Sequence, residues 1–318
     1  MNIMKKYIAL AAIALMVASC NKDMGGEKQN FDPTEIRVEA YIKQTRATDT
    51  SFEIGDRMSF YAVEYTGEDV AKLQVSGNYI NNEVMVYDGT EWRGERPLYW
   101  SKTHCDFYAI YPYQHPETVS EYIFHLPLDQ NRPETEEELS GYEAADLMWA
   151  KAEKIKPPYT TYFDDDGTVC TPPIAEDHYY PVQLRFKHMM SRVVVKLERG
   201  ENYEGELPED IAVHLYNTVT TAEVDLTKGS LQRYAYGEKE TITMKQLSND
   251  TFAAVVVPQN IERRTPLVEV TMDGIAYLLS YSTSFRPGYQ HTITVTLNTS
   301  PEQEKIEINI DGEVGEWE

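Results

Sequence analysis

The sequence predicts an all-β protein built from antiparallel β-sandwich domains. Three observations support this prediction. Tyr, Phe and Trp number 23, 9 and 4 in a chain of 318 residues, and aromatic residues are enriched in strands. Apolar residues beyond position 30 mostly recur with a period of two. The short runs that they form are separated by Gly and Pro turns, without the alternation of strands and long helices that a parallel sheet requires.

The strand at 291–297 has the clearest pattern. Ile293, Val295 and Leu297 fall on one face and threonines on the other, which is typical of a strand with one face on a core and one in water. Similar short runs predict further strands at 36–42, 58–63, 106–111, 122–126, 183–186, 192–197, 211–216, 241–245, 252–257, 267–272, 276–281 and 306–310.

Turn dipeptides separate these runs. Asp273-Gly274 lies between two strand-like segments and gives the sharpest hairpin prediction. A helix is conceivable only at 134–142, where the acidic run is more typical of a loop or a single turn. At about 150 residues per domain, the length suggests about two domains. The polar interruption at 198–210 favours domains at 31–199 and 200–318, and the Pro-rich 171–181 stretch is an alternative boundary.

Charge and composition exclude several function classes. The net charge of -23 would repel phosphate backbones, so we expect no nucleic-acid partner. Three Cys are too few for a disulfide scaffold or a Cys-rich zinc site. The apolar run at 8–17 is too short to span a bilayer as a helix, and the chain has no other such run, which excludes a multi-pass membrane protein.

The N-terminus predicts export and lipidation. Lys5 and Lys6 precede the apolar run, and small residues follow it, as in a secretory signal peptide at 1–19. Val17-Ala18-Ser19-Cys20 resembles the bacterial lipobox, in which the Cys thiol is diacylglycerylated and becomes the mature N-terminus. Residues 20–30 would then form a lipidated tether. A plain signal peptide with a chance Cys is the alternative.

Candidate chemistry is sparse. The seven His form no metal-binding spacing, and no nucleophile elbow, P-loop or dinucleotide-binding glycine pattern occurs, so we predict no catalytic residue, metal site or cofactor. The acidic loop Asp164-Asp165-Asp166-Gly167 could hold Ca²⁺, but a solvated hairpin tip explains it better. Cys105 and Cys170 could pair in an oxidising envelope, or remain two separate buried thiols.

Tyrosines cluster around the acidic loop. They could stack on sugars or on a partner protein, and aromatic filling of a sandwich explains them equally well. The residues concerned are Tyr159, Tyr162, Tyr179 and Tyr180.

A series of motifs along nearly the whole chain resembles the fimbrillin family, the lipoprotein-derived pilus subunits and fimbrillin-like accessory proteins of Bacteroidales-type bacteria. Each motif alone is weak, and their common order carries the resemblance. After the lipobox they are Thr45-Arg46-Ala47, the Gly55-Asp56 entry of 52–58, Tyr99-Trp100, the aromatic strand 106–113, Asp146-Leu147-Met148-Trp149-Ala150, the His188-containing 184–192, Val257-Pro258-Gln259, Phe285-Arg286-Pro287-Gly288 and the closing Ile308 to Trp317.

The resemblance implies two tandem transthyretin-like β-sandwich domains and a structural or adhesive role in a cell-surface fimbria. In this family an arginine-specific protease cuts near the end of the first strand, and loss of that strand leaves a groove in the subunit. An extended segment of the next subunit then fills this groove. Arg46 is then the candidate cut site, and Ile306, Ile308 and Ile310 form the candidate donor strand. A C-terminus that packs on its own subunit would instead indicate a tip or accessory subunit.

The implied partners are other fimbrial subunits, in a homo- or heteropolymer, the outer membrane through the lipid on Cys20, and a host or bacterial surface ligand. The implied location is the cell surface. Two alternative functions stay open. A glycan-binding surface lipoprotein would use exposed tyrosines such as Tyr179 and Tyr180, and a carboxylate-based hydrolase would use two acids that meet in space.

Overall fold

A computed structural model describes residues 32, 34–42, 51–136, 138–158, 162–163, 169–170, 180–299 and 308–317. Contacts divide the chain into a unit at 1–32 and a compact unit at 33–318, and only the second is described below. Strands make up nearly all of its regular structure, which confirms the all-β prediction. No helix in the described part of the chain is long and apolar enough to cross a membrane.

The N-terminal strands form one sheet that closes on itself. β2 pairs with both β4 and β6, so the hydrogen-bonded order β2-β4-β5-β1-β11-β8-β6 returns to β2 and makes a ring. The short β3 pairs antiparallel with the C-terminal end of β2. The strands are β1 (Val38–Ile42), β2 (Arg57–Thr66), β3 (Asp69–Val70), β4 (Ile80–Tyr87), β5 (Trp92–Gly94), β6 (Cys105–Tyr111), β8 (Met148–Ile155) and β11 (Val182–His188).

The ring encloses its own hydrophobic core, and its strand β6 also packs against a second, larger core outside the ring. Every residue of β6 is buried, because its two faces contact different cores. Phe107 and Ala109 belong to the core of the ring, whereas Tyr108 and Ile110 pack in the larger core shared with the C-terminal strands. The aromatic run that reads as a half-buried strand is therefore a strand covered on both faces.

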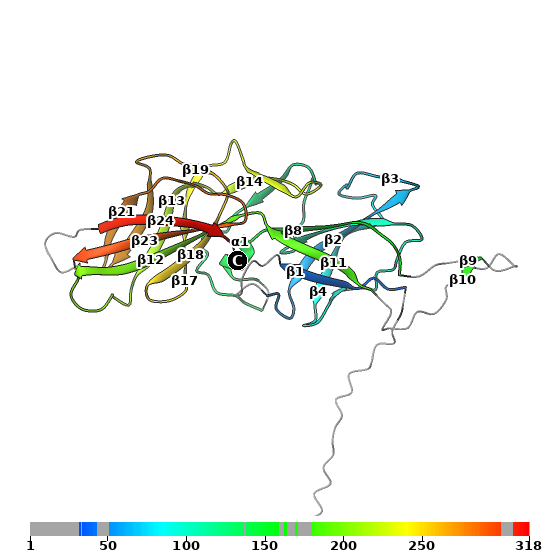
Figure 1. Cartoon of the computed structure of the whole chain (residues 1–318), viewed down its shortest axis with the longest axis horizontal. Coiled ribbons are helices and arrows are strands. Elements are labelled where there is room, and N and C mark those ends of the chain that lie inside the picture. The colour runs from blue at the N-terminus through cyan, green and yellow to red at the C-terminus, as the bar shows by residue number, and fades with distance from the viewer. Residues whose placement is uncertain are drawn as a thin grey trace, which may run out of the picture. The chain divides into compact units, whose positions relative to one another are not determined.

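The C-terminal strands form two further sheets around the larger core. One has the order β17-β18-β12-β23-β24 and the other β16-β13-β20-β21. Figure 1 shows β12, β23 and β24 running side by side. The strands are β12 (Ser191–Asn202), β13 (Ala212–Val219), β16 (Lys239–Thr243), β17 (Lys245–Gln246), β18 (Thr251–Val256), β20 (Pro266–Met272), β21 (Ile275–Ser280), β23 (Tyr289–Thr299) and β24 (Ile308–Glu316).

The expectation of purely antiparallel sheets needs one correction. β1 runs parallel to β11, and β12 runs parallel to β23. In both cases the paired strands are far apart in sequence, so the chain has room for the long crossover that a parallel pair needs. The predicted Asp273-Gly274 hairpin is confirmed, with Met272 opposite Ile275 and positive φ at both turn residues.

Several small elements complete the chain. The three-stranded sheet β15-β14-β7 joins a strand of the N-terminal half to two of the C-terminal half. The single helix of the described residues begins after Ser140, whose hydroxyl and the Glu143 carboxylate form a reciprocal capping box. The bounds are α1 (Gly141–Ala145), β7 (Tyr122–His125), β9 (Tyr162–Phe163), β10 (Val169–Cys170), β14 (Thr221–Asp225), β15 (Ser230–Arg233), β19 (Asn260–Ile261) and β22 (Thr283–Ser284).

The two halves are joined without a linker. Only Met189 and Met190, both buried, separate β11 of the ring from β12 of the five-stranded sheet. The predicted division at residues 199 and 200 falls inside β12, and the assignment of domains at 31–199 and 200–318 stays a prediction.

Two buried glutamines act as single-residue strand partners. The Gln130 amide accepts a hydrogen bond from Val255 N at 2.7 Å and donates one to Val255 O at 2.7 Å. Gln259 bonds Val219 in the same two-way manner, at 2.9 Å each. A primary amide reproduces the donor and acceptor of a peptide group, so each side chain satisfies a backbone that would otherwise be buried without partners.

Candidate functional site

The first candidate site is the position of β1 in the ring. β1 lies between β5 and β11, parallel to β11 from Val38 opposite Val182 to Ile42 opposite Phe186. Its contact with β5 is one pair, Val38 opposite Trp92. The segment before it is also bonded, because Ile36 N donates to Leu98 O at 2.7 Å. β1 therefore completes the sheet mainly through β11.

The side chains of β1 are anchored at its N-terminal end. Ile36 and Val38 are 2% and 0% exposed and pack in the core of the ring, whereas Tyr41 is 49% exposed. Loss of this strand would uncover the core beside Leu184 and leave the outer backbone groups of β11 without partners. The sheet would then present a groove with an open edge.

The predicted processing and lipidation residues lie outside the described part of the chain. Arg46 belongs to the segment 43–50, between the end of β1 and Ser51, and Cys20 belongs to the unit at 1–32. The acidic loop at 164–167 and Tyr179 are outside it as well, and Tyr180 is 74% exposed. Cys105 is a free, buried thiol, and burial raises its pKa to about 12.

The second candidate site is the C-terminal strand. β24 lies antiparallel to β23, from Leu297 opposite Ile308 to Tyr289 opposite Glu316. Ile308 and Ile310 are half-buried and pack against the larger core, with exposed Asn309 between them. Ile306 lies outside the described residues. The two described members of the candidate donor strand thus pack within their own subunit.

Trp317 holds the end of this strand. Its backbone N donates to Gly288 O at 3.0 Å, and the side chain is only 4% exposed. Its ring stacks on His188, with 4.0 Å between the ring centroids and 11° between the planes. At the edge of the imidazole, His188 Nδ1 lies 2.8 Å from Asp146 Oδ1. The imidazole is therefore fixed between a carboxylate and the terminal indole.

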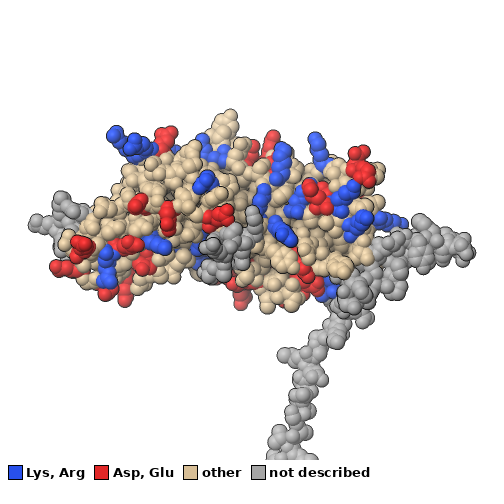
Figure 2. Space-filling model, in the orientation of Figure 1, with Lys and Arg blue, Asp and Glu red and all other residues tan. Residues whose placement is uncertain are grey.

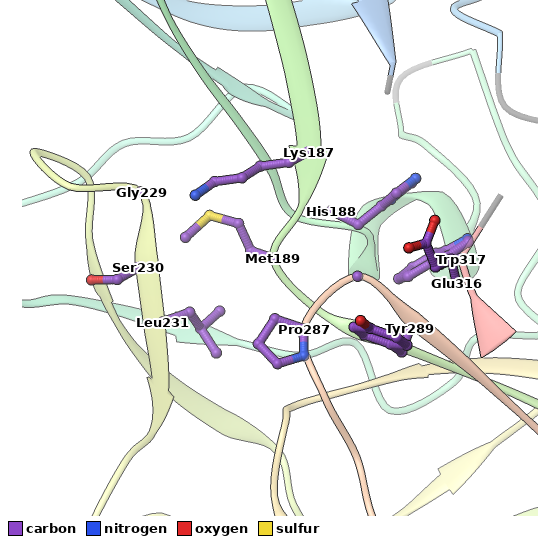
Figure 3. Close-up of a pocket in the computed structure, with 11 residues that line it drawn as sticks. Lys187, His188, Met189, Gly229, Ser230, Leu231, Pro287, Tyr289, Glu316 and Trp317 are labelled. Carbon is purple, nitrogen blue, oxygen red and sulfur yellow. The ribbon is translucent and has the colours of Figure 1, made fainter. Parts of the chain in front are cut away.

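A cavity of about 470 Å³ lies beside this anchor. Figure 3 shows Glu316 and Trp317 on one side and Met189, Leu231 and Pro287 on the other. The cavity thus borders the C-terminal strand, the β14–β15 hairpin and the start of β23, and release of β24 would enlarge it.

Residues of separate sequence motifs meet in pairs. Asp146 and His188, 42 positions apart, join at the anchor described above. Tyr111 donates to Asp56 Oδ1 at 3.0 Å, so the aromatic strand contacts the Gly-Asp entry of β2. Burial raises the pKa of Asp56, the largest effect on this carboxyl. The role of Trp317 as a partner of His188 was not predicted, because spacing alone cannot pair residues so distant.

No three His, Cys, Asp or Glu side chains in the part of the chain that the structure describes gather in a way that could hold a metal ion. His291 is buried against Phe285, and burial, with a smaller effect of Arg286, lowers its pKa to about 4. Charges of both signs are interspersed over the face in Figure 2. The features with a clear geometric role are thus β1 and the C-terminal strand β24, together with the strands that each of them pairs with.

Comparisons agree with this architecture. A family model described as fimbrillin-like matches residues 45–317. A crystal structure of a candidate cell adhesion protein from Bacteroides ovatus is similar at a TM-score of 0.64 and 15% identity, over 89% of this chain and 98% of that one. One from Bacteroides uniformis, also a candidate cell adhesion protein, reaches 0.61 at 16% identity, over 90% and 100%. No curated protein matches the sequence.

Proposed function

The chain belongs to the fimbrillin-like family, and from this membership we propose that it is a structural or adhesive component of a cell-surface fimbria. The observation that carries the proposal is the position of β1 between β5 and β11, which we call its seat. There β1 closes a ring of strands around a hydrophobic core. The similar structures are described as candidate cell adhesion proteins, which supports the same role. The protein acts through contacts between subunits and not through catalysis.

We propose that assembly proceeds by strand exchange at this seat. A protease cuts after Arg46, β1 leaves, and an extended segment of another subunit pairs with β11 and fills the pockets of Ile36 and Val38. Backbone hydrogen bonds then supply affinity and the buried side chains set the register. On the side opposite β11, β1 itself pairs with β5 at one position, and the segment before it adds the hydrogen bond from Ile36 N to Leu98 O.

The C-terminal strand has a different status in this proposal. Ile308 and Ile310 can serve as donors only after β24 separates from β23 and Trp317 leaves His188. A subunit that keeps this anchor accepts a strand but does not donate one, which corresponds to the end of a fibre. We therefore favour a tip or accessory position over a stalk position.

The test is controlled cleavage of the purified chain carrying Cys20→Ser. An arginine-specific protease should cut the chain after residue 46, and a synthetic peptide with alternating isoleucines should then bind. An Arg46→Ala variant, which keeps β1, is the matched control. Strand exchange is wrong if the cut chain loses β1, stays folded and binds no peptide.

Lipid anchoring is tested separately. Cys20 carries the lipid and holds the unprocessed protein in the outer membrane, where its partners are other fimbrial subunits and a surface ligand. Mass spectrometry of the N-terminus from the membrane fraction should find acylated Cys20, and Cys20→Ser should move the protein out of that fraction. An unmodified Cys20 in membranes would contradict this assignment.

A further inference from the structure

A second cavity, of about 370 Å³, lies where the ring meets the five-stranded sheet. Tyr111 of β6 and Met148 of β8 line it from the ring, and Arg192 of β12 and Lys245 of β17 line it from the sheet. Its volume falls within the range of about 300–1,000 Å³ that is typical of small-molecule sites. None of the functions derived so far uses this cavity.

Three hydrogen-bonding groups in its lining have no partner. Arg192 Nε, the Tyr142 hydroxyl and Trp317 Nε1 are buried, and none of them forms a hydrogen bond within the described part of the chain. Trp317 is only 4% exposed. In Figure 3 its ring nitrogen lies on the side away from Met189 and Leu231, and so away from the cavity of 470 Å³. Because buried donors without partners are costly, these groups call for an acceptor from outside the chain.

Carboxylates outnumber cations around the same cavity. An ionised carboxylate only accepts hydrogen bonds, so it calls for a donor. An anionic ligand would be repelled by the excess of negative charge, and a cationic ligand without acceptor atoms would leave the three buried donors unpaired. The five acids are Glu53, Asp56, Glu134, Glu143 and Asp146, and the two basic groups are Arg192 and Lys245.

We propose that this cavity binds a neutral sugar of one or two residues. A hydroxyl group donates and accepts at once, so one uncharged molecule can accept from Arg192 and Tyr142 and donate to the carboxylates. Leu139 and Leu247 supply apolar surface for the C–H groups of the sugar ring. Glu53, Glu134 and Leu247 are exposed, which leaves the rim of the cavity open to solvent.

The site gives the adhesive role proposed above a ligand, and it rests on that role. It requires neither a cut after Arg46 nor the loss of β1. The binding experiment therefore uses the uncut chain, and its failure would leave the strand-exchange proposal standing.

Ligand-observed NMR of the full mature chain carrying Cys20→Ser tests the site, with glucose, galactose, mannose, fucose and N-acetylglucosamine as probes. We expect at least one of them to bind with a Kd of about 1 mM or tighter, and Tyr142→Phe and Arg192→Met each to weaken binding at least about tenfold. Tyr61→Phe is the matched control, because it removes another buried hydroxyl without a partner, outside this cavity, and should leave binding unchanged. Binding of none of these sugars, or binding insensitive to both changes, overturns the proposal.

Charged analogues of the same size test the ligand class. Glucuronate carries a carboxylate, glucosamine an ammonium group, and glycine both charges. Each should bind more weakly than the best neutral sugar, because only the neutral sugar satisfies donors and carboxylates together without adding charge. Tighter binding of any of the three would overturn the assignment to a neutral sugar.

Urea unfolding separates loss of binding from loss of fold. The Tyr142 hydroxyl has no partner within the described chain, so Tyr142→Phe should leave the unfolding midpoint unchanged or raise it. A lower midpoint would show that the hydroxyl is already satisfied inside the protein, and would overturn its role as a ligand contact.

Discussion

Replacement of Trp317 by Ala tests whether the C-terminal strand is an integral part of the fold. The side chain is 4% exposed and stacks on His188, which is itself buried. Removal of a buried Trp ring costs about 3–5 kcal/mol, and loss of an aromatic pair adds about 0.5–1.5 kcal/mol to the effect of burial alone. Because both terms act on the same ring, we expect Trp317→Ala to lower the free energy of unfolding by about 4 kcal/mol.

The assay is urea unfolding followed by far-ultraviolet circular dichroism, with the free energy taken from midpoint and slope. Trp317→Phe keeps a ring over His188 and should lose less than half as much. Val314→Ala, at a residue of β24 that is 45% exposed, should change stability by no more than about 0.5 kcal/mol. A loss below about 1 kcal/mol for Trp317→Ala would refute the reasoning, because a strand that is not held by its terminal indole would be free to leave.

Three further predictions follow from buried polar groups. Gln130→Ala leaves the Val255 N–H and C=O without partners and should cost about 2–3 kcal/mol in the same unfolding assay, whereas Gln232→Ala, at an exposed amide, should cost almost nothing. His291 has a folded pKa of about 4 against an ordinary value of 6.5, so the unfolded chain binds an extra proton between these values and stability falls as pH drops from 6.5 to 4. His291→Gln should flatten that pH dependence, and an unchanged slope would contradict the assignment. The Cys105 thiol, with its pKa near 12, should be inert to a disulfide reagent at pH 8 in the folded Cys20→Ser, Cys170→Ser chain and react after denaturation; reaction in the folded chain would contradict its burial.

The strands with clear alternation could be predicted from the sequence. In β23, Ile293, Val295 and Leu297 are all fully buried, as the period of two required. The Asp273-Gly274 hairpin was predicted by turn chemistry, since both residues adopt positive φ. These elements depend on local backbone preference and on one buried face, which are both visible in a short window of sequence.

Other elements have no such clear pattern in the sequence. β8 buries Met148, Ala150 and Ala152, and alanines give little β preference, so its alternation was not recognised. β4 contains Asn82 at positive φ, where the ladder with β2 shifts register. The helix α1 begins with a capping box at Ser140 and Glu143, which the acidic run before it obscured. In β8 and β4 tertiary contacts decided the structure, whereas the capping box of α1 is a local signal that was missed.

The candidate site was predictable only in part. The resemblance placed the motifs of Asp146 and His188 in order along the chain, but not in contact, because a pair 42 positions apart depends on how the sheets meet. Closure of the N-terminal sheet into a ring depends on the second partner of β2, which no local pattern specifies. The seat of β1 therefore followed from the structure, and its place near the N-terminus from the sequence.

The direct passage from β11 to β12 has a mechanical consequence. Only Met189 and Met190 lie between them, so in the proposed fimbria a pulling force on β11 would reach the second sheet through one continuous backbone. There β12 runs parallel to β23 from Arg192 opposite Gln290 onward. A force that slides two strands past each other loads their hydrogen bonds together, whereas peeling breaks them one by one. This arrangement suits the proposed fimbrial role, in which tension would pass from one subunit to the next.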